Sequence, residues 1–166
     1  MRINVNLPLT GNSRKVARFI NKHVTSEVGS KIDFSDGFTY PHINENDVEF
    51  IAKNVELISK KERLGKFAFT GVYRPEDTSK YLFMRLENPE EIVSLKRKIY
   101  DLVSHKISPL KHGGVPHVTI AYLDSIEKHI EIEAFNAIDW KPEYIAISMV
   151  GDNGTCIDDI FRCKIG

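Results

Sequence analysis

The sequence predicts a single α+β domain, residues 1–166, built from two similar halves. Its 166 residues are 42% apolar and 28% charged, as in an ordinary globular domain. Strand-like alternation and helix-like spacing succeed each other along the chain, and no linker or low-complexity tract divides it. A Pro-His pair followed by a β-branched residue occurs twice, at His42 and at His117, 75 residues apart. This spacing fits a duplicated half-domain.

The first half begins with a strand and a helix. Residues 2–9 alternate between apolar and polar side chains, which predicts a strand. Asn12 or Ser13 is expected to cap the helix that follows, and Gly29 to end it. Its apolar residues recur at helical spacing: Val16, Phe19, Ile20 and Val24. The stretch that leads into the first Pro-His pair is expected to be extended.

Two capping boxes predict the starts of a second and a third helix. One box is Asn46 with Glu49, and the other is Asn88 with Glu91, where Pro89 suits the first helical position. The apolar residues after each box lie on one helical face. They are Val48, Ile51, Val55 and Ile58 in the second helix, and Ile92, Leu95, Ile99, Leu102 and Val103 in the third.

The remaining segments predict strands. Residues 66–74 and 80–87 flank a short loop and predict a hairpin, and 143–150 and 155–165 predict another, joined by a tight turn. Residues 115–123 are rich in β-branched residues and predict a strand, whereas 124–138 fit a helix or a strand equally well. Trp140 is expected to cover an edge of the core.

The charge and cysteine content exclude several classes of protein. Lysine plus arginine equals aspartate plus glutamate, 23 against 23, so the net field attracts a long polyanion little, which argues against a duplex nucleic-acid binder. Cys156 and Cys163 lie in one expected strand, about 23 Å apart, and should not form a disulfide. We expect no metal, no cofactor and no membrane span, and a cytoplasmic location.

The two Pro-His segments together carry the chemistry of a phosphate site. In a strand, residues i and i+2 share a face, so His42 lies beside Asn44 and His117 beside Thr119. If both strands line one site, one imidazole can accept a proton from a nucleophile while the other donates one to the leaving oxygen. Hydrogen-bond donors next to them can hold the phosphate oxygens. These groups suit the cleavage of a phosphodiester without a metal.

These two motifs, the order of the elements and the length resemble the 2H phosphoesterase superfamily, which includes 2′-5′ RNA ligase-like proteins and cyclic phosphodiesterases. That superfamily is named for two His-x-Thr/Ser motifs. PHVT at 116–119 is similar to its second motif, and PHIN at 41–44 is similar to its first, with Asn44 where a hydroxyl residue is usual. Tyr122 stands where many ligase-like members carry an arginine.

The resemblance implies a bilobal α+β fold with two pseudo-symmetric antiparallel β-sheet lobes, flanking helices and a central cleft. It also implies a metal-independent phosphodiesterase that acts on cyclic phosphates, 2′-5′ linkages or cyclic oligonucleotides. Carried over to this chain, His42 and His117 are the catalytic pair, and Thr119 and Asn44 are the donors to the phosphate. The expected partner is a nucleotide or short oligonucleotide substrate, and no protein partner is implied.

Three more residues are candidates for substrate binding, each with an ordinary structural alternative. Tyr40 lies two residues before the first histidine and could stack on a base, or could simply pack beside a proline. Lys111 could attract a phosphate, or could belong to a flexible loop. Tyr122 is a candidate although strict alternation sends it away from the His117 face. Asn44 also has an alternative, because it begins a run that could cap a helix.

Two further functions remain open. One is a non-catalytic nucleotide or RNA binder built on the same fold, in which Asn44 marks the decay of the first motif. The other is a phage-type enzyme that destroys cyclic-nucleotide immune signals and uses the same catalytic residues. The two motifs occupy equivalent positions in the two similar halves, so the sequence does not say which histidine is the base.

Overall fold

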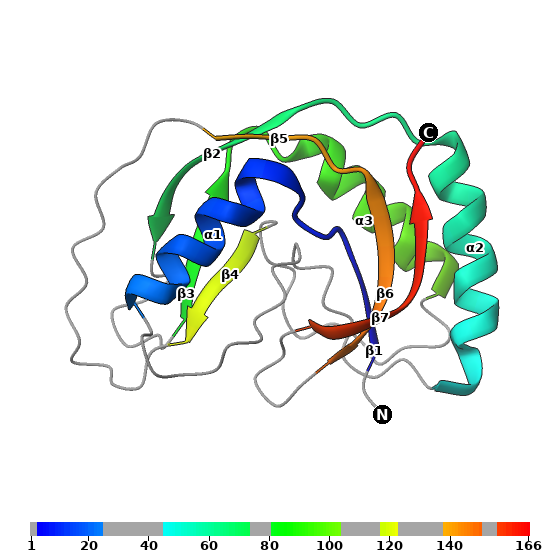
Figure 1. Cartoon of the computed structure of the whole chain (residues 1–166). Helices are drawn as coiled ribbons and strands as arrows, with labels where there is room; N and C mark the ends of the chain where they lie inside the picture. The colour runs from blue at the N-terminus through cyan, green and yellow to red at the C-terminus, as the bar shows by residue number, and fades with distance from the viewer. Residues whose placement is uncertain (1–2, 25–44, 74–80, 104–116, 123–137, 151–155) are drawn as a thin grey trace.

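The computed structural model describes residues 3–24, 45–73, 81–103, 117–122, 138–150 and 156–166. These segments form two antiparallel sheets, one of three strands and one of four, with helices packed around them (Figure 1). The fold class predicted from the sequence is therefore confirmed. In chain order the elements are β1 (Ile3–Asn6), α1 (Gly11–Val24), the short 3₁₀ helix η1 (Glu45–Asp47), α2 (Val48–Lys61), β2 (Phe67–Tyr73), β3 (Tyr81–Leu86), α3 (Glu90–Val103), β4 (His117–Tyr122), β5 (Ile138–Trp140), β6 (Tyr144–Val150) and β7 (Cys156–Lys164).

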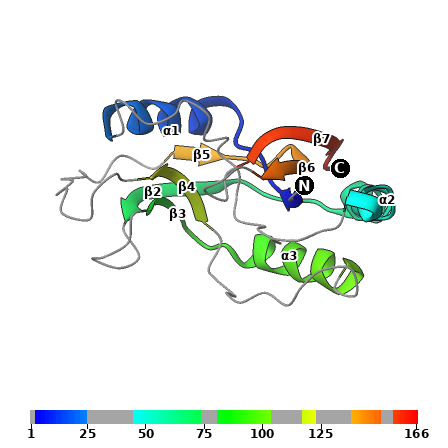
Figure 2. The same ribbon diagram turned by 90° about the horizontal axis from the view of Figure 1, so that it is seen from below.

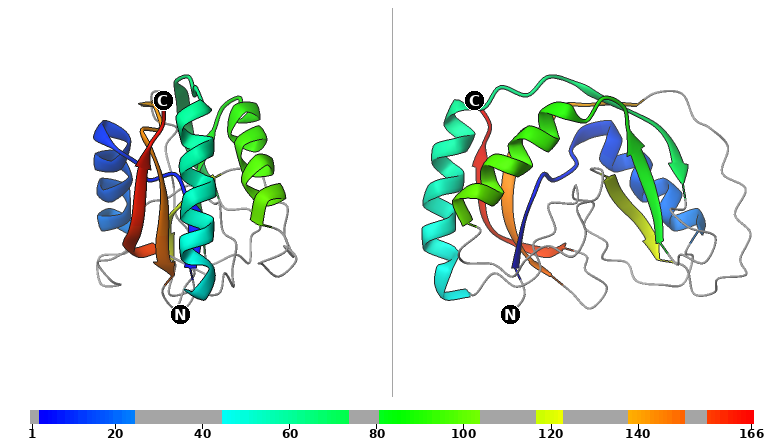
Figure 3. Two further views of the ribbon diagram at one scale, coloured as in Figure 1. Left: turned by 90° about the vertical axis from the view of Figure 1, so that its right-hand side faces the viewer. Right: turned by 180° about the vertical axis from the view of Figure 1, so that it is seen from behind.

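The three-stranded sheet has the order β1-β6-β7. The predicted hairpin of β6 and β7 is confirmed, and β1 pairs with β6 with Val5 opposite Ile147. Val5 and Ile147 are buried together with Ile51 and Val55 of α2, the helix that packs on β6 and β7. Figures 1 and 3 show α2 on the outer side of this sheet. The opposite face is turned toward the four-stranded sheet.

The four-stranded sheet has the order β4-β3-β2-β5. The predicted β2–β3 hairpin is confirmed, with an irregularity in the pairing between Phe69 and Gly71. The strand predicted over 115–123 is confirmed as β4, which pairs with β3. Of the ambiguous segment 124–138 only Ile138 is described, and it begins β5. The stretch before the first Pro-His pair lies outside the described residues.

The helices form where the sequence predicts them, but their caps differ. The first helix begins at Gly11, so the two predicted caps Asn12 and Ser13 lie in its first turn. The 3₁₀ helix η1 precedes the second helix, and Asp47 holds the cap position, where its side chain makes no capping hydrogen bond. A capping acceptor is less needed there because the 3₁₀ turn already leads into the helix.

The capping box predicted at Asn88 and Glu91 has a different geometry. Asn88 has a positive φ of 49°, whereas a helix cap has its backbone in the extended region. The carboxylate of Glu91 accepts a hydrogen bond from the backbone N–H of Gly65 at 3.0 Å. Glu91 thus connects the start of α3 to the segment between α2 and β2. Figure 2 shows α1 and α3 on opposite sides of the molecule.

Two small residues of α1 are buried among its described side chains. Ser13 and Ala17 are buried, whereas Phe19, part of the apolar pattern that predicted the helix, is 63% exposed. Ser13 and Ala17 are four residues apart, one helical turn, and they let the helix approach β4 and β5 closely. Of that pattern, Phe19 does not belong to the buried face of the helix.

Trp140 lies inside the core. It is 2% exposed, and its ring stacks on Phe69 with the centroids 5.4 Å apart, while Phe67 lies tilted beside it. The expectation that it covers an edge of the core is wrong.

Both cysteines are free, as expected, with Cys156 buried and Cys163 half-buried. Within the described ranges, no helix is long and apolar enough to cross a membrane.

Candidate functional site

The second Pro-His motif opens β4. Val118 and Ile120 are completely buried, and Thr119 between them is half-buried. This alternation is that of a strand with one face in the core, into which Val118 and Ile120 pack. The positions of His117 and Thr119 therefore belong to the other face of the sheet. β4 is at one edge of the sheet in its described strand order.

The neighbour of this motif in the sheet is β3. The Cα atoms of His117, Val118 and Thr119 pair with those of Arg85, Met84 and Phe83. The sequence predicted both strands but not that they pair, and so it missed Arg85. One signal was present: Leu82, Met84 and Leu86 alternate as apolar residues and are all buried, which assigns position 85 to the opposite face.

Helix α1 also contacts β4, through a side-chain hydrogen bond to the backbone of the strand. The side-chain amide of Asn21 donates a hydrogen bond of 2.7 Å to the carbonyl oxygen of Ile120. Asn21 continues the series of Ser13 and Ala17 at four-residue spacing. The small, polar face of α1 thus packs close to the strand that carries the second motif and satisfies one of its backbone acceptors.

Four of the seven candidate residues lie outside the described residues. They are His42, Asn44 and Tyr40 of the first motif, and Lys111. The other three, His117, Thr119 and Tyr122, all belong to β4, where Tyr122 ends the strand opposite Tyr81. The structure thus brings these three together in one strand, and the meeting of the two motifs stays a prediction.

The face of the three-stranded sheet that is turned toward the other sheet carries a buried polar network. The amide of Asn6 donates to Asn4 Oδ1 at 2.9 Å and to Ser148 Oγ at 2.8 Å. The hydroxyl of Ser148 donates to Asp159 Oδ1 at 2.7 Å, and Arg162 binds the other carboxylate oxygen. Since a carboxylate only accepts, Ser148 must accept from Asn6, and this fixes the amide orientation.

This network leaves one acceptor unpaired. Asn6 Oδ1 is buried and has no hydrogen-bond partner among the described residues. Cys156 lies in the same cluster, with its sulfur 3.3 Å from the side-chain nitrogen of Asn4. The sequence shows Asn4 and Asn6 only as the polar positions of an alternating strand, so nothing in it distinguished them from solvent-exposed residues.

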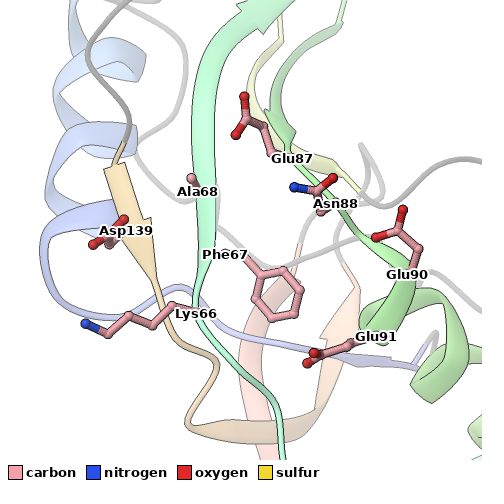
Figure 4. Close-up of a pocket in the computed structure, with 8 residues that line it drawn as sticks. All are labelled: Lys66, Phe67, Ala68, Glu87, Asn88, Glu90, Glu91 and Asp139. Atoms are coloured by element: carbon pink, nitrogen blue, oxygen red, sulfur yellow. The ribbon is translucent and has the colours of Figure 1, made fainter.

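A pocket of about 400 Å³ lies at the start of α3, next to the start of β2 and to β5 (Figure 4). Four carboxylates and one lysine line it, together with two apolar residues and one amide: Glu87, Glu90, Glu91, Asp139, Lys66, Phe67, Ala68 and Asn88. An excess of negative charge repels a phosphate. The pocket contains no residue of β4, and we do not assign it to the phosphate site. Across the described part of the chain, no group of three metal-ligating side chains is gathered.

Comparison with known proteins shows what this fold is. No protein-family model and no curated protein sequence matches the chain. Solved structures do match. The structure of TT0787 from Thermus thermophilus superimposes with a TM-score of 0.80 and 15% identity, over 99% of this chain and 98% of that one. A structure described as a phosphoesterase gives 0.65 and 16%, over 99% and 97%.

The E. coli protein LigT also matches. Its complex with 3′-AMP superimposes with a TM-score of 0.70 and 13% identity, over 99% of this chain and 97% of that one. LigT has also been solved with NADP+, with ATP and with phosphate. At these identities the likeness is one of fold, and it extends over nearly the whole length of both chains. The protein described here therefore shares its fold with TT0787 and with LigT.

Proposed function

We propose that this protein is a 2H-type phosphodiesterase. In the proposed reaction it opens a cyclic phosphate, or cuts a 2′-5′ or cyclic-oligonucleotide bond, by general acid–base catalysis with His42 and His117. One observation carries the proposal: a phosphoesterase fold, shared over nearly the whole chain, in which a His-x-Thr motif opens a strand. The nucleotide complexes of LigT support a nucleotide as the substrate class.

The proposed hydrolysis balances with two histidines in opposite protonation states. A water oxygen attacks phosphorus while one neutral imidazole accepts the proton of that water. The other histidine, as imidazolium, donates its proton to the ribose oxygen when its bond to phosphorus breaks. The Thr119 hydroxyl and the Asn44 amide donate hydrogen bonds to the non-bridging oxygens, where negative charge develops. General acid–base catalysis by one neutral and one protonated histidine should give a bell-shaped dependence of the rate on pH.

The test is hydrolysis by the purified protein in excess chelator. The substrates are 2′,3′-cyclic nucleotides, 2′-5′ oligoadenylate, and cyclic di- and trinucleotides. His42→Ala and His117→Ala should each lower kcat by about 10² to 10⁴-fold, the usual contribution of a general acid or base. His129→Ala, outside both motifs, is the control and should leave kcat unchanged. Activity that persists when both motif histidines are replaced would refute the proposal.

The same assay separates the two alternatives. A nucleotide binder without catalysis would bind these ligands tightly but form no product, and Asn44→Thr would not change this. Restored or increased turnover in Asn44→Thr would instead support a catalytic first motif in which the amide is a weaker donor than a hydroxyl. Preference for cyclic oligonucleotides over 2′,3′-cyclic mononucleotides would favour the immune-signal substrate.

A further inference from the structure

Three positions on neighbouring strands form a row across the four-stranded sheet at the start of the second motif. His117 on β4 pairs with Arg85 on β3, and Arg85 pairs with Gly71 on β2. Residues that pair directly in an antiparallel sheet occupy the same face, with Cβ atoms about 4.5–5.5 Å apart. The irregularity in the β3–β4 pairing lies away from the Arg85–His117 pair, between Leu82 and Phe83, whereas that in the β2–β3 pairing adjoins Gly71.

Burial of the alternate positions decides which face this row occupies. Met84 and Leu86 flank Arg85 in β3 and are at most 3% exposed, and Val118, which follows His117, is completely buried. Because successive residues of a strand alternate between faces, Arg85 and His117 belong to the face opposite this apolar layer. Thr119, the proposed phosphate donor, belongs to the same face by the same alternation.

The third position of the row is a glycine. Gly71 carries no side chain, and a Cβ added there would meet no atom of the described residues within 4 Å. Position 85 therefore has a residue without a side chain opposite it on β2 and the second motif opposite it on β4. An arginine spans more than the distance between neighbouring strands, so a phosphate held at His117 is within its range.

We infer that Arg85 is a phosphate-binding residue of the same site, which binds the non-bridging oxygens of the substrate beside His117. A guanidinium is always charged and presents paired N–H donors that match the geometry of a phosphate. A fixed cation at this place favours the transition state, in which negative charge develops on these oxygens. The inference rests on the proposed function, because that function makes His117 a residue of the phosphate site.

The experiment combines binding and turnover. Isothermal titration with inorganic phosphate and with 3′-AMP measures binding, and hydrolysis of 2′,3′-cyclic AMP measures kcat/KM. Arg85→Gln should weaken phosphate binding at least 10-fold and lower kcat/KM at least 100-fold. Arg97→Gln makes the same charge change at an exposed position of α3 and should leave both unchanged. Added guanidinium ion should restore part of the kcat/KM of Arg85→Ala, which a purely structural role would not allow.

The outcomes separate this inference from the proposed function. If Arg85→Gln binds phosphate as well as Arg97→Gln does, the inference is wrong, whether or not the wild-type protein turns over. If the wild type forms no product but Arg85→Gln loses phosphate binding, the inference holds and the catalytic proposal fails. If Arg85→Gln does not fold, Arg85→Lys tests the inference in its place. It should lower kcat/KM about 10-fold, because lysine lacks the paired donors, and an unchanged value would contradict the inference.

Discussion

The side-chain nitrogen of Asn21 lies 2.7 Å from the carbonyl oxygen of Ile120. This hydrogen bond connects α1 to β4, two elements that are far apart in the sequence, and it acts on the strand that carries His117 and Thr119. Its effect on the protein is testable because α1 also offers an exposed asparagine, Asn12, for comparison.

Asn21→Ala should destabilise the fold by about 1–2 kcal/mol, since it leaves a backbone acceptor of β4 without its partner. The amides of β4 should also exchange faster with deuterium than those of β6, because the loss is local. Urea unfolding followed by the fluorescence of Trp140, the only tryptophan, measures the first effect, and hydrogen exchange measures the second. Asn12→Ala should change neither, and equal effects of the two variants would show that the bond to Ile120 contributes nothing.

Ser148→Ala should lower the free energy of unfolding by about 1–3 kcal/mol. It removes both an acceptor for the buried Asn6 amide and the donor to Asp159. A buried polar group that loses a hydrogen-bond partner is not compensated for the water it gave up on folding, which costs free energy. Ser94→Ala, an exposed change on α3, should lie within about 0.5 kcal/mol of the wild type. Urea unfolding of the three proteins gives the comparison. A Ser148→Ala variant as stable as Ser94→Ala would mean that the network does not stabilise the sheet.

Gly11→Ala should destabilise the protein by about 1–2 kcal/mol. Gly11 begins α1 with a φ of +60°, a conformation that an L-residue adopts only with strain, although a Cβ there would meet no atom of the described part of the chain within 4 Å. Gly65→Ala is the matched control, because an added Cβ makes only an ordinary contact of 3.7 Å with Glu91 and the backbone φ is not positive. Thermal unfolding should show a lower Tm for Gly11→Ala alone. Equal Tm values would contradict the assignment of strain to Gly11.

Cys163 should make stability fall with pH in the alkaline range. Burial raises the pKa of its thiol because the thiolate is poorly solvated there, and the nearby Glu56 carboxylate adds to the effect. As the pH rises above the ordinary thiol pKa of about 8.5, the unfolded chain loses this proton first, so stability decreases until the folded thiol also ionises. Unfolding in urea between about pH 8 and pH 10 should show a shallower decline for Cys163→Ser than for the wild type. Parallel curves would contradict this.

Local patterns predicted most of the described elements. Both hairpins, the strand of the second motif and the buried faces of α2 and α3 follow from apolar residues at intervals of two or of three and four. The starts of the helices were less predictable. Asn46 and Glu49 match a capping box, yet a 3₁₀ turn precedes α2, because the way in which the chain enters a helix depends on what the preceding residues pack against.

Phe19 is an apolar residue of the helical pattern in α1 that the structure leaves exposed. Its spacing is that of an apolar face, but its side chain is exposed, whereas Ser13 and Ala17 are buried and Asn21 hydrogen-bonds to β4. The same applies to Asn4 and Asn6, whose polarity suggested solvent but which are buried by the network around Ser148.

The sequence by itself determined that residues 117–122 form a strand, which of its residues enter the core, and that His117 and Thr119 share a face, because the two-residue period of a strand is a local property of the chain. Only the tertiary structure decided that β3 is the partner of this strand, that Arg85 lies opposite His117, and that α1 hydrogen-bonds to its backbone. Pairing between strands depends on which apolar faces pack together over long distances in sequence, and no local pattern contains that information.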